Sequence, residues 1–278
     1  MVYEYYHEGF FGYSLEKDFN YWSLAHFLPI ILLCVGIWLT YRYREKIKNC
    51  KWEQNIRFII GAVLIFTEAF YYWRLLYVGN SGKDFQMIAY LPLQVCEWSA
   101  FIAAFMVMKK SKHMFDVCYY ICLTLGIIPF FMPAVIEYTG PGYARYYQFW
   151  LEHLVPVYAV FYMMFVHGFK ADYKKIWKPF SVLAVLAVFA IIANTRIEGA
   201  NFMYLAAGTD GDSIANILPE NIWVRLVLYI GILIVLFTLI SLPQIISQIR
   251  AYKKKKAARL AEENEAVVEV AVTEEKEE

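Results

Sequence analysis

The chain has 278 residues, of which 60% are hydrophobic, 19% are aromatic and only 18% are charged. This composition excludes an ordinary soluble domain of this length and predicts an all-α, polytopic membrane protein. The formal net charge of +1 excludes the strongly basic footprint of a nucleic-acid-binding protein.

The first 20 residues are rich in aromatic side chains, with acidic residues and glycines between them. Aromatic side chains gather at the headgroup level of membranes, so we expect residues 1–20 to form an outer interfacial segment. The basic and small-residue pattern of a cleaved signal peptide is missing here, and we therefore expect the first apolar run to be retained.

Seven apolar runs follow, each close to the length of about 20 residues that a helix needs to cross about 30 Å of hydrocarbon. They cover Tyr21–Tyr41, Arg57–Val78, Phe85–Met108, His113–Pro133, Tyr146–His167, Trp177–Thr195 and Ile222–Ile246. The sequence therefore predicts a transmembrane domain of seven helices over residues 21–246.

Basic residues fall mainly in every second connection between these runs. They are Arg42, Arg44, Lys46, Lys48 and Lys51 after the first; Lys109, Lys110 and Lys112 after the third; Lys170, Lys174, Lys175 and Lys178 after the fifth; and the cations of the tail. By the positive-inside rule, this alternation predicts an N-terminus outside the cell and a C-terminus in the cytosol. We expect a multi-pass protein of a cell membrane, the bacterial plasma membrane.

The tail at residues 247–278 is a run of lysines followed by glutamates. We expect it to be disordered or to form a frayed helix in the cytosol, where its lysines stop transfer through the membrane. Nothing in it identifies a soluble partner.

Polar side chains inside the predicted spans share one depth. Counted at about 1.5 Å per residue from the outer end of each span, they lie roughly 7–18 Å below the outer surface. These residues are His26, Glu68, Gln94, Cys96, Glu97, Glu152 and His153. Because unpaired polar groups cost several kcal/mol in hydrocarbon, this layer predicts a polar cavity open to the outer face. Asp116 and His167 lie near the basic connections instead, where an interfacial position or an ion pair explains them.

Simpler explanations stand beside the functional one. Glu68 and Glu97 can join helices as buried hydrogen-bonding groups, and a cysteine such as Cys96 is more often a small buried hydrophobe than a nucleophile. Cys118 and Cys122 are expected in the core, because no acid or histidine near them in sequence completes a metal site. We expect neither a metal nor a cofactor.

Cys96 nevertheless has neighbours that suit chemistry. Pro92 is predicted to kink the third span beside it, and His153 at matching depth can accept a thiol proton, as a Cys/His pair for nucleophilic catalysis requires. Gln94 is about 200° away from Cys96 on an ideal helix, so whether both face one cavity stays open. The loop at Asn201 can act as a lid over the cavity, or it can be an ordinary interfacial loop.

Four segments carry a resemblance to a known family. They are His26, Leu91-Pro92-Leu93-Gln94-Val95-Cys96, Phe149-Trp150-Leu151-Glu152-His153 and Asn201-Phe202-Met203-Tyr204-Leu205. The chain resembles the YwaF-like multi-pass membrane family of bacteria, which looks related to the eukaryotic transmembrane protein 164, to which a cysteine- and histidine-dependent lipid acyltransferase activity is attributed. The resemblance implies that Cys96 accepts the acyl group and that His153 is the general acid or base.

Two further positions, His26 and Asn201, match recurrent residues of that family. The chain departs from the family pattern at Gln94, where the family has a histidine; the amide can hydrogen-bond but cannot titrate.

The function expected from these features is a phospholipid acyltransferase that works through a thioester on Cys96, with membrane lipids as its partners. Glu152, Glu97 or His26 would orient His153. The alternative is a membrane protein that binds or transports a small molecule or a lipid in the same cavity, and a receptor or structural role is a third class. An apolar inner half disfavours a conduction path.

Overall fold

The computed structural model describes residues 9–12, 22–78, 91–131, 140–197, 200–206 and 219–274, and every regular element in these ranges is helical. The helices are α1 (Leu24–Lys48), α2 (Glu53–Val78), α3 (Val95–Lys109), α4 (Lys112–Thr124), η2 (Leu125–Ile127), α5 (Ile128–Phe131), α6 (Ala144–His167), η3 (Tyr173–Lys175), α7 (Trp177–Arg196), η4 (Phe202–Tyr204) and α8 (Ile222–Glu274). The contacts within the chain divide it into two units, Met1–Phe237 and Thr238–Glu278. The all-α prediction is confirmed.

Six helical stretches in the described ranges are long and apolar enough to cross a membrane. They are Leu24–Lys48, Glu53–Arg74, Lys112–Phe131, Ala144–His167, Tyr173–Arg196 and Ile222–Ala258. The protein is therefore a multi-pass membrane protein, with six such helices where the sequence predicted seven spans.

Helix α3 accounts for the difference. It has 15 residues and at about 1.5 Å per residue it is about 22 Å long, shorter than the hydrocarbon layer. The sequence predicted a span over Phe85–Met108, of which residues 85–90 lie outside the described ranges. The helix begins only at Val95, after the non-helical residues Leu91–Leu93.

The predicted kink at Pro92 is therefore wrong, because this proline precedes the helix. A proline restrains the residue before it to extended conformations, which delays the start of a helix. Gln94 is the N-cap, with extended backbone angles, and the Glu97 carboxylate accepts its backbone N–H at 3.0 Å. Indole Nε1 of Trp98 donates to the Pro92 carbonyl, so the segment before the helix is tied to its first turn.

Two other prolines act inside helices. The α4 helix gives way to the 3₁₀ turn η2 at Leu125, the residue whose carbonyl would bond to the N–H that Pro129 lacks. Helix α6 runs unbroken through Pro156, although this proline deprives the Glu152 carbonyl of its helical donor.

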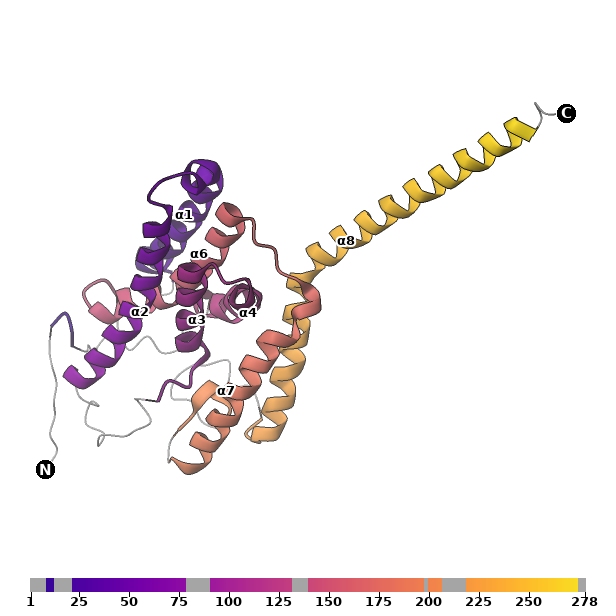
Figure 1. The fold of residues 1–278 in the computed structure, drawn as a ribbon. Helices are drawn as coiled ribbons and strands as arrows, with labels where there is room; N and C mark the ends of the chain where they lie inside the picture. The colour runs from indigo at the N-terminus through magenta and orange to yellow at the C-terminus, as the bar shows by residue number, and fades with distance from the viewer. Residues whose placement is uncertain are drawn as a thin grey trace, which may run out of the picture. The chain divides into compact units, whose positions relative to one another are not determined.

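Helix α6 is the centre of the first unit and packs against α1, α2, α3 and α4 (Figure 1). Helix α2 packs closely along α3, and a Cβ added at Gly61 would lie only 2.6 Å from Cε of Met108. These contacts bring the start of α3, the second half of α2 and the first half of α6 to one end of the bundle.

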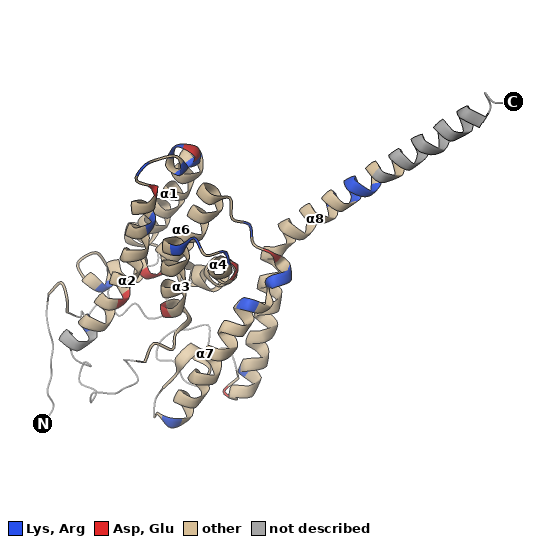
Figure 2. Cartoon of the chain, viewed as in Figure 1, with Lys and Arg blue, Asp and Glu red and all other residues tan. Residues whose placement is uncertain are grey.

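Ion pairs hold the opposite end. Glu53 accepts hydrogen bonds from Nε of Arg57 at 2.8 Å and from Nε2 of His167 at 2.7 Å, and Arg57 also donates to the Val107 and Met108 carbonyls. Asp116, which is fully buried, pairs with Lys112 and Lys178. Figure 2 shows Lys and Arg gathered at the end of α1 and around the start of α7, and again within α8.

Helix α1 covers one side of α6 and leaves most of its own surface exposed. Two hydrogen bonds join the helices, from the Tyr146 hydroxyl to the Ala25 carbonyl at 2.5 Å and between Thr40 and the Tyr158 hydroxyl at 2.9 Å. An apolar groove of about 480 Å³ lies between the two helices. Its lining includes Leu28, Leu32, Gly36, Trp150, Leu154 and Tyr158.

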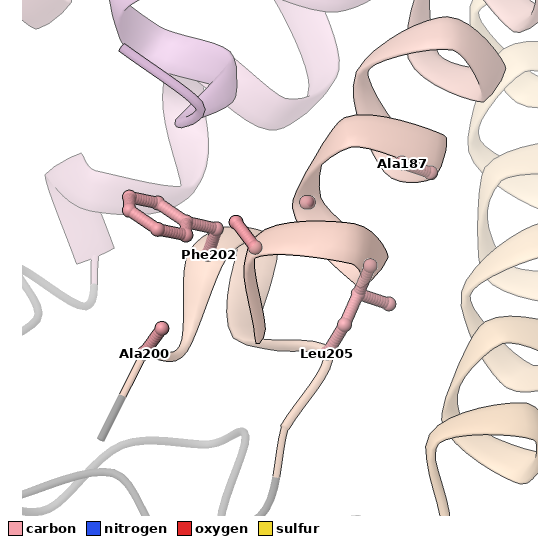
Figure 3. Packing of buried hydrophobic residues seen from close by; sticks show 6 residues of the cluster. Ala187, Ala200, Phe202 and Leu205 are labelled. Carbon is pink, nitrogen blue, oxygen red and sulfur yellow. The ribbon is translucent and has the colours of Figure 1, made fainter. Parts of the chain in front are cut away.

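The loop after α7 packs back onto that helix. Ala200, Phe202 and Leu205 form a buried cluster with alanines of α7, of which Ala187 is labelled in Figure 3. Leu91 and Leu93 pack against the same cluster, so the η4 loop adjoins the segment that leads into α3.

Helix α8 continues through the charged tail as far as Glu274. Lysine, alanine, arginine and glutamate dominate this stretch and are strong helix formers. Of the two states expected for the tail, the structure has the helical one. The division of the chain at residues 20 and 246 stays a prediction.

Candidate active site

Cys96, Glu152 and His153 meet between α3 and α6. Sγ of Cys96, a carboxylate oxygen of Glu152 and a ring nitrogen of His153 all lie within 4.8 Å of one another. Cys96 is partly buried, and both α6 residues are buried. The sequence placed these residues at similar depth without showing contact, and the fold brings them together.

Cys96 is the second residue of α3, not a residue in the middle of a span. The first N–H groups of a helix have no intrahelical acceptor and carry a partial positive charge. Burial and the carboxylates of Glu152 and Glu97 oppose the effect of this partial charge and raise the pKa of the Cys96 thiol above its usual value, so the sulfur needs a base to become a nucleophile. Ser99 Oγ donates to the Cys96 carbonyl at 2.7 Å and steadies this turn.

His153 is held in one tautomer. Its Nδ1 lies 2.8 Å from the Phe149 carbonyl, which can only accept, so Nδ1 carries a proton and Nε2 of the neutral ring is the acceptor. The ring also packs on Phe149, with 4.5 Å between centroids. The ring of His153 is therefore a base whose orientation is fixed.

Glu152 is hydrogen-bonded to the Cys96 thiol and accepts a bond from Gln148 Nε2 at 2.8 Å. Arg145 lies 3.5 Å from the same carboxylate, and its guanidinium lies over the Tyr71 ring at 4.8 Å from the centroid. Arg145 and Gln148 were not among the site residues predicted from the sequence. Their spacing of seven and four residues before Glu152 places all three on one helical face, and this spacing was the available signal.

Glu97 has two partners in the described residues. One oxygen accepts the Tyr72 hydroxyl at 3.0 Å, and the other accepts the backbone N–H of Gln94. Glu97 therefore caps α3 and links it to α2, which agrees with the simpler explanation of a buried residue that joins helices. Tyr72 was also missed.

Glu68 lies one turn before Tyr72 on α2 and is 1% exposed. Neither of its carboxylate oxygens has a hydrogen-bond partner among the described residues. Its charge interacts with those of Glu152 and Glu97, so Glu68 belongs to the same cluster.

Gln94 connects the site to the η4 loop. Its Oε1 accepts the backbone N–H of Met203 at 3.1 Å. Two other side chains hold this loop, since Asn194 bonds both backbone groups of Phe202 and Arg225 donates to the Tyr204 carbonyl. The Gln94 amide therefore has a structural partner.

Asn201 folds back onto its own loop, where its Oδ1 accepts the Ala206 N–H at 2.9 Å. Met203 and Tyr204 both have a φ of +54°, a strained conformation for residues with a side chain. Partial burial raises the pKa of Tyr204, and the charges of Cys96 and Tyr229 add to the shift. Its phenol is therefore neutral at neutral pH and close enough to Cys96 to interact with it.

His26 lies elsewhere. Its ring packs edge-on against Trp150 at 5.5 Å and against Phe27 at 5.2 Å, and it hydrogen-bonds to the backbone of Phe130. These contacts place His26 between α1, α5 and α6. The contacts that the structure describes do not join it to Cys96.

The arrangement has the parts that nucleophilic acyl transfer needs: a sulfur nucleophile at a helix N-terminus, an oriented imidazole and a carboxylate beside both. The same three side chains are also ligands for soft divalent metals. No curated protein and no solved structure matches the chain. The model of the TMEM164 family matches residues 21–241, which is most of the chain, so this multi-pass membrane protein belongs to the TMEM164 family.

Proposed function

We propose that the protein is a membrane-embedded lipid acyltransferase in which Cys96 carries the acyl group as a thioester and His153 moves the proton. The observation that carries the proposal is the mutual approach of Cys96, Glu152 and His153 within 4.8 Å. We also propose that the protein is related to the YwaF-like family, that it lies in a cell membrane and that its N-terminus faces outward.

In the first half-reaction, Nε2 of His153 takes the thiol proton and Sγ attacks the ester carbonyl of a phospholipid. A carbon–sulfur bond forms, the ester carbon–oxygen bond breaks, and the leaving lysolipid takes the proton from the imidazolium. Glu152 balances the imidazolium charge, as the third group of a triad does.

In the second half-reaction, the hydroxyl of an acceptor lysolipid gives its proton to His153 and attacks the thioester. The carbon–sulfur bond breaks and the thiolate is restored. The N–H groups of Val95 and Cys96 in the first turn of α3 lie next to the sulfur and suit the oxyanion of both tetrahedral intermediates.

The apolar groove between α1 and α6 supports a lipid substrate. It is lined by Leu28, Leu32, Leu154 and other apolar side chains, and its α6 wall flanks His153 in sequence. An acyl chain can lie in this groove while the ester reaches the polar cluster.

The test uses full-length protein in detergent, stripped of metal and incubated with a phospholipid that is labelled in its acyl chain. We expect a hydroxylamine-sensitive adduct on the wild type, none on Cys96→Ala, and a rate at least about 100-fold lower for His153→Ala. Cys118→Ala and His113→Ala are the matched controls and should behave as wild type. A wild type that never acquires the label would overturn the proposal in favour of a binding or transport protein that uses the same cavity.

A further inference from the structure

The described residues around Glu68 leave its buried carboxylate without a hydrogen-bond partner. It is 1% exposed, and in the part of the chain that the structure describes neither oxygen accepts a hydrogen bond. Buried polar groups in folded proteins have partners with few exceptions, and an ionised one without a partner is costly. A buried carboxylate without a hydrogen-bond partner therefore indicates that a proton or a cation binds to it and neutralises its charge.

The charges around Glu68 favour a cation. Its carboxylate interacts with those of Glu152 and Glu97 and with Cys96, and Glu152 and Glu97 are 5% and 6% exposed. Arg145 supplies a positive charge 3.5 Å from Glu152. The buried carboxylates of Glu68, Glu97 and Glu152 all interact with this guanidinium, in a region of low dielectric constant where uncompensated charge is destabilising.

The donor atoms identify the kind of cation. Sulfur of Cys96, nitrogen of His153 and oxygen of Glu152 are within 4.8 Å of one another. A tetrahedral zinc site, with bonds of about 2.0–2.3 Å, holds its ligand atoms about 3.3–3.8 Å apart, so an inward movement of about 1 Å would close the site. Thiolate and imidazole ligands select zinc-like metals over magnesium and calcium, which prefer oxygen.

The surrounding hydrogen bonds also suit a metal site. Ligating histidines usually donate their other ring N–H to a carbonyl or carboxylate, and Nδ1 of His153 donates to the Phe149 carbonyl. Gln148 Nε2 holds the Glu152 carboxylate at 2.8 Å. Both side chains are thereby oriented before an ion arrives.

We propose that Cys96, Glu152 and His153 bind one zinc-class divalent ion, and that the nearby Glu68 carboxylate balances part of the charge of the ion. The metal–sulfur bond forms as the thiol proton leaves for the solvent. Metal binding does not depend on the proposed acyl transfer. One consequence does rest on it: ion and acyl group compete for the same sulfur, so the bound ion keeps the protein inactive.

The experiment titrates Co²⁺ into the full-length protein in detergent, after a chelator has been used and removed. We expect one Co²⁺ per chain with a thiolate-to-cobalt charge-transfer band, which Zn²⁺ abolishes by displacement. Cys96→Ser should lose the band, and Glu68→Gln should bind Co²⁺ about 10-fold more weakly. Cys118→Ser and Cys122→Ser are the controls, because these two buried cysteines lie outside the proposed site. Both variants should keep the band.

A wild type without the band would overturn the site, as would a band that survives Cys96→Ser or disappears with Cys118→Ser. Unchanged affinity in Glu68→Gln would overturn the role of Glu68 in balancing the charge of the ion. Folding of each variant is checked by circular dichroism and size-exclusion chromatography, and Zn²⁺ should raise the Tm of the wild type but not of Cys96→Ser.

Labelling of metal-free protein by phospholipid separates this inference from the proposed function. Acylation without cobalt binding overturns the metal site alone, and cobalt binding without acylation overturns the acyltransferase alone. If both occur but Zn²⁺ does not slow the labelling, the competition for sulfur is overturned.

Discussion

The Gln94 amide oxygen accepts the backbone N–H of Met203 at 3.1 Å, so the N-cap residue of α3 also holds the η4 loop. Gln94→Ala removes this bond, which is worth about 1 kcal/mol. We expect roughly five-fold slower acylation of Cys96 and faster cleavage of the η4 loop by protease. Gln54→Ala, an exposed residue of α2, is the control; equal protease sensitivity of the two variants would contradict the role of Gln94 in holding the loop.

Because Met203 has a left-handed backbone conformation, a glycine at this position should be more stable than an alanine, which is the reverse of the usual order. At most positions glycine is less stable than alanine by about 0.5–1 kcal/mol. At a φ of +54° a side chain costs about 1–2 kcal/mol, so Met203→Gly should be more stable than Met203→Ala by about 1 kcal/mol. Thermal unfolding in detergent compares the two variants, and a lower Tm for the glycine variant would rule out strain at this residue.

Glu152→Gln tests the carboxylate beside the catalytic pair. The amide keeps the size of the side chain but cannot balance an imidazolium. We expect the rate of Cys96 acylation to fall about 10²- to 10⁴-fold with little change in lipid affinity. Glu45→Gln, an exposed change on α1, should leave the rate unchanged, and a variant Glu152→Gln at full rate would remove Glu152 from the mechanism.

Glu53 should affect stability without affecting chemistry. It pairs with Arg57 and His167 at the end of the bundle opposite Cys96, and removing one partner of a buried ion pair typically costs about 3–5 kcal/mol. Glu53→Gln should therefore lower the Tm markedly. The folded fraction should still acylate Cys96 at the wild-type rate; a slower rate would connect the two ends of the bundle.

Filling the groove between α1 and α6 should change which lipids react. Leu32→Trp places an indole between Leu28 and Gly36 on the groove wall. We expect long-chain phospholipids to acylate Cys96 at least about 10-fold more slowly, because one or two kcal/mol of chain burial is lost, while short-chain lipids react as before. Val185→Trp, on the exposed face of α7, is the control, and an equal effect on all chain lengths would argue against this groove.

Much of the fold was predictable from composition and periodicity. Apolar runs of about 20 residues predicted helices that the structure has, with α6 and α7 within about two residues of the expected bounds. For Asp116 and His167, the charges at the helix ends left an interfacial position or an ion pair open, and both residues form ion pairs. These features are local, and local patterns are readable in one sequence.

The start of α3 was not predictable in the same way. The run from residue 85 to Met108 is predominantly apolar, and hydropathy does not tell helix from extended backbone. Pro92 signals a break but not on which side of it the helix lies. Placing Cys96 in a first turn needed the cap made by Gln94 and Glu97.

The partners within the site depend on the fold. Depth counting gathered Cys96, Glu152 and His153 in one layer, and they do meet. The same counting included His26, which packs against Trp150 instead, because depth leaves the rotation of a helix undetermined. The bond between Gln94 and Met203 joins residues 109 positions apart, and no periodicity reports a contact of that kind.

The two hydrogen bonds that join α1 to α6 also define a length. Tyr146 binds the Ala25 carbonyl and Tyr158 binds Thr40, and at about 1.5 Å per residue these bridges stand roughly 20 Å apart along the helices. The groove between them is lined mainly by apolar side chains such as Leu32 and Leu154. A fatty-acyl chain that lies straight in this groove would have to fit between these two polar contacts. The position of the contact between Tyr158 and Thr40 would therefore decide the length of the longest chain that fits.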